Sequence, residues 1–217
     1  MTSYTRVTPL LAIILSLVLT ACGGQQSSGD DLPPIPPTIT PMPAATPVAP
    51  STPVNLEGDL LEPLEDGQEV LPEDQRYSIV LPEFWVSGSA PGADIAYRES
   101  GGTPEDHEYA FNVMRERLPA NITNAAAYAE SGRDSVEESF EDAETIAMEP
   151  VQVGDAQGML WIYEITVTVD PVLVHQVYIV DGRTGFLLTG SAPADGDHDA
   201  AIDVFSAITG SFTLPRG

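Results

Sequence analysis

Apolar residues occupy every second position of one segment in the second half of the chain, as in a β-strand with one buried face. The apolar face carries Met159, Trp161, Tyr163, Ile165, Val167 and Val169. The opposite face carries Glu164, Thr166 and Thr168 and is expected to be partly wet. This segment is therefore predicted to be a core strand.

Turn signals on both sides of the next strand predict hairpins. Asp170-Pro171 predicts a turn, residues 172–180 the returning strand, Asp181-Gly182 a tight turn, and residues 184–190 the strand after it. Because these strands follow one another directly, we expect them to be antiparallel. In the first half of the folded region, strands are predicted at residues 77–81, 94–98 and 108–115, with a turn at 82–85 and a loop at 101–104.

Two segments have the spacing of three and four residues that is typical of amphipathic helices. The first carries Ile122, Ala125, Ala129, Arg133, Val136 and Phe140, with Asn121 or Thr123 as candidate N-cap and Gly132 as a weak point. The second carries Ala201, Val204, Phe205, Ile208 and Phe212, and the acidic residues 195–199 suit its N-terminus. The predicted fold class is α+β, an antiparallel β-sheet with helices packed on it.

The N-terminus has the organisation of a secretory signal. Arg6 precedes an apolar run from Leu10 to Leu19, which is too short to span a bilayer, and the small residue Ala21 precedes Cys22. Leu19-Thr20-Ala21-Cys22 resembles the lipobox of bacterial lipoproteins. The resemblance implies removal of residues 1–21 and acylation of the Cys22 thiol, so that a lipid anchors the protein to a membrane. The alternative is an ordinary free thiol after a secretory signal.

Residues 22–75 are predicted to be a disordered tether. Nine prolines lie between Pro33 and Pro53, and this composition cannot bury a core. Residues 55–75 are rich in Asp and Glu and are assigned to the same arm, although Leu56, Leu60, Leu61 and Leu64 leave open an amphipathic turn induced by a partner. The predicted organisation is a signal peptide at 1–21, the tether at 22–75, and one domain at 76–217.

Charge excludes several classes of function. Acidic residues number 33 against eight basic ones, for a net charge of −25. A surface this acidic repels nucleic acid, and we expect no nucleic-acid partner. All eight basic residues are arginine, so P-loop and Schiff-base lysine chemistry are excluded. Since Cys22 is the only cysteine, the folded part has no disulfide and no cysteine-based zinc site.

The order of motifs resembles a known superfamily. Tyr77-x-Ile-x-Leu-Pro-x-x-Trp85, a mid-chain helix, a long hairpin around Trp161 and Tyr163, and a closing helix before Ser211-Phe212 resemble the PsbP-like proteins of the PsbP, Mog1, DcrB and LpqN type. The resemblance covers roughly residues 76 to 214. It implies an α/β/α sandwich and a binding or assembly role, and it transfers no catalytic residue.

Candidate chemistry is sparse. Asp195, Asp197 and Asp199 alternate as in a calcium loop, but Ala200 and Ser206 replace the glycine and the closing glutamate of an EF-hand; helix capping is the alternative interpretation. The histidines, His107, His175 and His198, are far apart, and His175 is expected to be half-buried in a strand. Ser89 lacks the glycine two residues before it that a nucleophile elbow requires. No catalytic residue and no cofactor are predicted.

These observations predict a lipid-anchored, extracytoplasmic binding or adaptor lipoprotein without catalytic activity. Its expected contacts are the membrane, through Cys22, and a protein partner in the cell envelope. The location is the outer face of the cytoplasmic membrane, or the outer membrane in a two-membrane bacterium. Two alternatives remain open: an accessory hydrolase of the cell envelope, and an adaptor that depends on a divalent cation.

Overall fold

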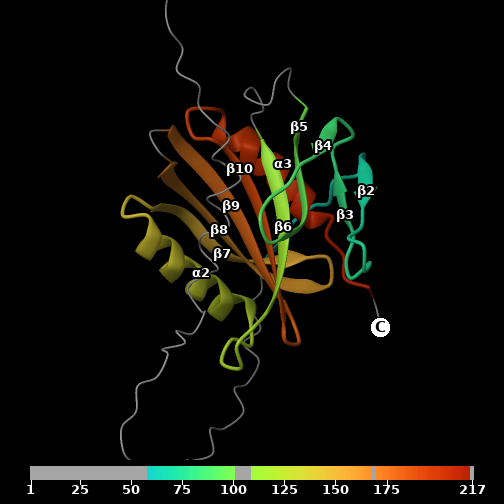
Figure 1. The fold of residues 1–217 in the computed structure, drawn as a ribbon, viewed down its shortest axis with the longest axis horizontal. Helices are drawn as coiled ribbons and strands as arrows, with labels where there is room; N and C mark the ends of the chain where they lie inside the picture. The colour runs from blue at the N-terminus through green and yellow to red at the C-terminus, as the bar shows by residue number, and fades with distance from the viewer. Residues whose placement is uncertain (1–57, 101–108, 168–169, 216–217) are drawn as a thin grey trace, which may run out of the picture.

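A large curved sheet forms the centre of the molecule in the computed structural model, which describes residues 58–100, 109–167 and 170–215 (Figure 1). Its strands, in spatial order, are β1 (Asp59–Leu60), β7 (Glu144–Val153), β8 (Ala156–Val167), β9 (Asp170–Asp181), β10 (Thr184–Pro193), β6 (Ala110–Arg117), β5 (Ala93–Glu99) and β4 (Trp85–Ser87). All neighbours are antiparallel except β1, which pairs in parallel with β7. A small second sheet pairs β2 (Gln68–Val70) with β3 (Ile79–Leu81).

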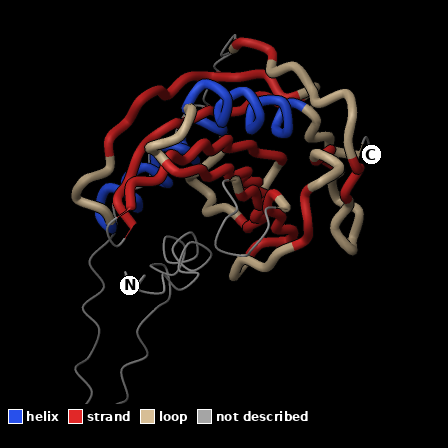
Figure 2. Tube along the Cα trace, turned by 90° about the horizontal axis from the view of Figure 1, so that it is seen from above, coloured by secondary structure: helices blue, strands red, loops and turns tan. Residues whose placement is uncertain are grey.

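Two helices cover opposite faces of the large sheet (Figures 1 and 2). Helix α2 (Ala125–Ser139) packs over β8 and β9, where Trp161, Tyr163 and Tyr178 are buried. Helix α3 (His198–Gly210) and the β2–β3 hairpin cover the other face, and their core cluster includes Phe205. The predicted α+β architecture, an antiparallel sheet with helices on it, is confirmed.

Strand β8 is buried on both faces, not on one. Trp161 and Tyr163 lie on the α2 side, as the alternation predicts. On the opposite face, Leu160 and Ile162 belong to the same buried cluster as Phe205 of α3. Solvent exposure on this face begins at Glu164. The prediction of a partly wet second face is confirmed at Glu164 and Thr166, which are half-buried and exposed.

Two local predictions need correction. The N-cap of α2 is neither Asn121 nor Thr123 but Asn124, whose side chain accepts a hydrogen bond of 2.8 Å from the Ala127 N–H. Asp170-Pro171 is not a turn; the two residues open β9, opposite Val167 and Thr166 of β8.

Gly132 lies within the continuous helix α2 and lets the helix approach the sheet. A Cβ at this position would lie 2.4 Å from the Tyr178 hydroxyl oxygen. The absence of a side chain therefore allows the helix to pack closely over β9.

The ordered domain begins earlier than residue 76. Strand β1 pairs with β7, and β2 pairs with β3. The Leu61 N–H donates to the Gln152 carbonyl at 3.0 Å, and the Leu64 N–H donates to the Ala207 carbonyl at 2.9 Å. Because Leu61 and Leu64 pack against the core, this acidic stretch belongs to the domain rather than to the tether.

The predicted signal peptide (1–21), Cys22 and the rest of the predicted tether up to residue 57 lie outside the described residues. Within the described ranges, no helix is long and apolar enough to cross a bilayer.

Candidate functional site: an arginine-lined cleft

Half of the eight arginines line one cleft of about 710 Å³. Arg115 and Arg117 come from β6, Arg183 from the turn between β9 and β10, and Arg76 from the segment between β2 and β3. The rest of the lining is of two kinds. Three residues are acidic: Asp74, Glu116 and Asp181. The others are apolar or carry a hydroxyl: Thr184, Phe186, Leu214 and Pro215. The volume is within the range of small-molecule sites.

Strand geometry explains why two arginines enter the cleft together. Arg115 and Arg117 are two residues apart on β6, and alternate residues of a strand share a face. Glu116, between them, points to the α2 side, where its carboxylate accepts a hydrogen bond of 2.6 Å from the Tyr128 hydroxyl. The antiparallel register places Thr184 of β10 directly opposite Arg117.

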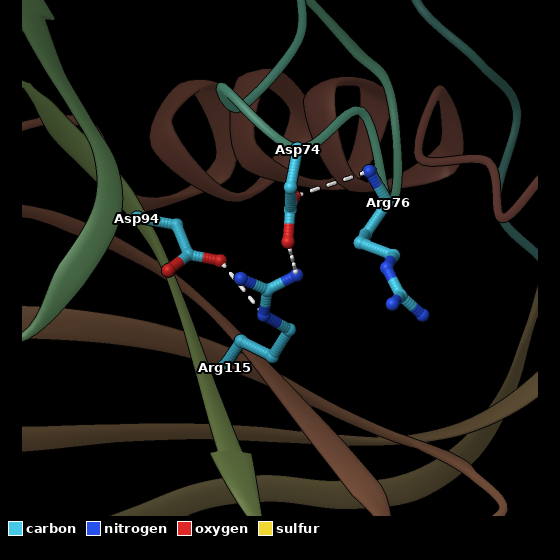
Figure 3. A network of polar contacts seen from close by, with 4 residues as sticks. All are labelled: Asp74, Arg76, Asp94 and Arg115. Atoms are coloured by element: carbon cyan, nitrogen blue, oxygen red, sulfur yellow. Dashed lines mark hydrogen bonds and ion pairs between the residues drawn. The ribbon is translucent and has the colours of Figure 1, made fainter.

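Arg115 is held by two carboxylates, as Figure 3 shows. Its guanidinium donates to Asp74 at 2.6 Å, and its Nε lies 3.2 Å from a carboxylate oxygen of Asp94. Asp94 lies in a β-bulge, where the register of β5 against β6 shifts between Ala93 and Ile95. Since a bulge redirects the side chain of its extra residue, this irregularity of β5 accounts for the contact.

The two carboxylates of this network differ in their protonation energetics. The hydrogen bond from Arg115 lowers the pKa of the exposed Asp74 carboxyl below its ordinary value. Burial raises the pKa of Asp94, and the nearby Arg115 offsets only part of that effect. The hydrogen bond with Asp74 raises the pKa of Arg115 in turn. Asp74 is therefore the more firmly ionised of the two.

The segment that carries Asp74 has a strained backbone. Gln75 has φ of 51°, in the left-handed region that non-glycine residues rarely adopt. Its N–H donates to the Pro72 carbonyl at 3.0 Å. The Arg76 N–H lies 3.3 Å from the Asp74 carboxylate, so a local turn directs Asp74 toward Arg115 (Figure 3).

The other arginines keep donors for a ligand. Arg183 donates from its Nε and one terminal nitrogen to the Leu118 carbonyl, at 3.2 and 2.8 Å. Arg76 and Arg117 are exposed, and neither guanidinium forms an ion pair with a carboxylate of the described residues. Three of the four arginines can therefore donate to an added anion without breaking an ion pair within the described residues.

Tyr77 packs next to the cleft-lining Phe186 and is 1% exposed. Its ring packs against Phe186 and Phe212, with centroids 5.9 and 5.2 Å away. The hydroxyl has no hydrogen-bond partner among the described residues, and burial together with the charge of Asp94 raises its pKa. Phe186, which lines the cleft, is thus backed by buried aromatic rings, and the Tyr77 hydroxyl behind it is unsatisfied within the described residues.

The predicted calcium ligands lie at the start of α3. Asp195, Asp197 and Asp199 are all exposed, and Asp197 is the N-cap, with its carboxylate accepting from the Ala200 N–H at 3.1 Å. No group of three or more potential metal-ligating acids, histidines or cysteines gathers anywhere in the described residues. Cation binding there stays a prediction: a rise in Tm with saturating calcium would support it, and an unchanged Tm would contradict it.

The histidines do not form a site within the described residues. His175 is completely buried rather than half-buried, with its Nε2 3.2 Å from the Ser206 hydroxyl, and burial lowers its pKa to about 4. His198 contacts the Ala194 carbonyl at 2.6 Å and lies 3.6 Å from Glu164. His107 lies outside the described residues.

Comparison with known proteins supports the fold. No protein-family model and no curated protein matches the sequence. The structure of PsbP (CyanoP) from the cyanobacterium Synechocystis matches with a TM-score of 0.51 and 16% identity, over 68% of this chain and 92% of that one. LpqN of Mycobacterium tuberculosis, described as involved in cell envelope biogenesis, matches with a TM-score of 0.51 and 12% identity, over 68% and 90%. The predicted PsbP-like fold is confirmed.

Proposed function

We propose that this protein is a lipid-anchored, extracytoplasmic binding domain without catalytic activity, and that the arginine-lined cleft is its binding surface. One observation carries the proposal: half of the basic residues of a chain with net charge −25 gather at a single cleft. On a surface that otherwise repels anions, such a concentration marks the place where an anionic group is held. Apolar side chains in the same cleft would add affinity by contacting the rest of the ligand.

The proposed lipid anchor is inferred from the sequence around Cys22. Acylation there would tie the mature N-terminus to the outer face of a membrane, and the proline-rich segment after it would hold the domain away from the lipid surface. The outer membrane is the alternative site in a two-membrane bacterium. LpqN, which shares the fold, is described as acting in cell envelope biogenesis, and we extend an envelope role to this chain by analogy.

Binding suits the cleft better than catalysis. Its described lining consists of arginines, carboxylates, one threonine and apolar side chains. Arginine donates charge-assisted hydrogen bonds in a fixed planar arrangement, which recognises an anion without transferring a proton. A panel of envelope-directed hydrolase assays tests the competing hydrolase hypothesis: turnover abolished by mutation of an acidic residue would overturn the proposal.

A crosslinked pull-down from the native membranes tests the proposed function. It compares four forms of the full chain: wild type, Cys22→Ser, which cannot be acylated, Arg76→Gln/Arg117→Gln, and the control Arg98→Gln. Arg98 lies on β5 and does not line the cleft.

We expect wild type and Arg98→Gln to recover the same defined envelope component. Cys22→Ser should lose it because the domain is no longer held at the membrane, and the double variant because the cleft has lost two cationic groups. Equal recovery by all four forms would contradict the proposal, and recovery by none would contradict a protein partner in the cell envelope.

A further inference from the structure

We propose that the cleft binds a small oxyanion, a phosphate or carboxylate group, and that the Asp74 carboxylate occupies part of this site until the ligand displaces it from Arg115. This inference rests on the proposed function, because it takes the cleft as the binding surface. It adds the chemical class of the ligand and a competing group within the chain.

The net charge of the chain disfavours a large polyanion as the ligand. A chain with net charge −25 repels a polyanion at long range, so nucleic acid and a strongly anionic membrane are disfavoured as ligands. A ligand with one anionic group meets little of that repulsion and gains short-range hydrogen bonds instead. The cleft, about 710 Å³ in volume, is large enough for such a group and an attached body.

The arginines provide the matching donors. Arg76 and Arg117 are exposed and have no ion pair with a described carboxylate, and Arg183 keeps one terminal nitrogen beyond its bonds to the Leu118 carbonyl. The planar guanidinium matches the paired oxygens of phosphate and carboxylate groups. Thr184, opposite Arg117, places a hydroxyl-bearing residue on the same wall.

Asp74 shows that this site accepts a carboxylate. It lines the cleft and already accepts a hydrogen bond of 2.6 Å from Arg115, which an external anion would have to replace. Its side chain is 45% exposed and therefore open to competition. When Asp74 moves away, Arg115 keeps Asp94, at 3.2 Å, and the cation is never left without a partner.

The backbone beside Asp74 favours such a displacement. A non-glycine residue in the left-handed region stores strain, and strain of this kind gathers at ligand clamps and switch segments. Gln75 is the one non-glycine residue of the described ranges with positive φ, and it directly follows Asp74. The strained turn lowers the cost of a second arrangement in which Asp74 leaves Arg115.

Calorimetric titration of the full chain in a neutral detergent tests the inference. The probes are inorganic phosphate and acetate, each at constant ionic strength, with chloride as the control anion. The variants are Arg76→Gln, Arg117→Gln and Asp74→Asn, with Arg98→Gln as the control outside the cleft. The Tm of every variant is measured first, so that a folding defect is not read as lost affinity.

We expect saturable binding of phosphate, acetate or both, and the stronger probe identifies the oxyanion. Arg76→Gln and Arg117→Gln should each weaken it by about tenfold, the loss typical of one charge-assisted hydrogen bond. Asp74→Asn should tighten binding several-fold, because the competing carboxylate is gone. Arg98→Gln should bind as wild type.

Absence of saturable binding for both probes, or wild-type affinity in both cleft arginine variants, would overturn the oxyanion proposal. Unchanged or weaker binding by Asp74→Asn would overturn the competing role of Asp74, since a purely structural aspartate gives that result. If the titration fails while the pull-down still depends on Arg76 and Arg117, the binding function stands with a different class of ligand.

Discussion

Replacing His175 with leucine should remove a large part of the pH dependence of stability. The His175 side chain is fully buried, with Nδ1 unpartnered among the described residues, and burial lowers the pKa from 6.5 to about 4. Folding therefore requires the neutral imidazole. The contribution of the neutral His175 to the unfolding free energy is complete above pH 6.5. It is lost as pH falls toward 4, because in this range only the unfolded chain takes up the proton.

The size of the effect follows from the two pKa values. Linkage with pKa 6.5 unfolded and about 4 folded gives a loss of about 2 kcal/mol in unfolding free energy between about pH 7.5 and about pH 5. This window lies above the range in which ordinary carboxyl groups take up most of their protons. His175→Leu should lack this component, so the pH dependence of its unfolding free energy should be flatter by the same amount.

Urea unfolding of the two proteins across this pH window measures the difference. Ser206→Ala is the matched control: it removes the hydrogen bond to His175 but leaves the imidazole buried, so its pH dependence should follow wild type. Burial is the first cause of the lowered pKa, which is why the hydroxyl matters less. If wild type and His175→Leu have the same pH dependence within about 0.5 kcal/mol, the reasoning from burial is refuted.

Three further predictions address the core, a helix cap and the anchor. Gly190→Ala should lower the unfolding free energy by about 1–3 kcal/mol, because its Cβ would lie 2.3 Å from Cγ of Phe205. Gly88→Ala should not, because its Cβ would lie 3.8 Å from the nearest atom, the Ala96 carbonyl oxygen, and equal losses in urea titrations would contradict this. Asn124→Ala should cost about 1 kcal/mol through the lost N-cap of α2, and a comparable loss in Thr123→Ala would show that the cap is misassigned. Cells fed labelled palmitate should label wild type but not Cys22→Ser, and label retained by the variant would exclude acylation at this cysteine.

The hairpin and the second helix could be predicted because their signals are local. Alternation identified the α2-facing side of β8, Asp181-Gly182 marked a turn in which Gly182 has φ of 61°, and Asp197 precedes α3 as its N-cap. Each of these depends on residues within a few positions of one another. Local chemistry alone was sufficient to place them.

The parts that sequence missed depend on contacts between distant segments. The acidic composition of residues 58–75 predicted disorder. The structure instead orders Leu61 and Leu64 by packing them on a core made of later strands. Strand β7 was not predicted. It contains Pro150, and its first six residues do not alternate between buried and exposed.

The cleft was missed for the same reason. Arg115-x-Arg117 gave the one local signal, two cations on one face of a strand in a chain with eight. Their meeting with Arg183 and Arg76 requires the register of β6 against β10 and the packing of the β2–β3 hairpin on the sheet. Neither can be read from spacing along the chain.

Site-specific photocrosslinking in the native membrane tests most directly whether the cleft is the binding surface. A benzophenone side chain is placed at Thr184, in the cleft, and in a second protein at Val86, which is 41% exposed on the edge strand β4 and does not line the cleft. The account predicts a discrete crosslinked product from position 184 that Arg117→Gln reduces, and none from position 86. A product from position 86 alone would contradict it and move the binding surface to the exposed edge of the sheet.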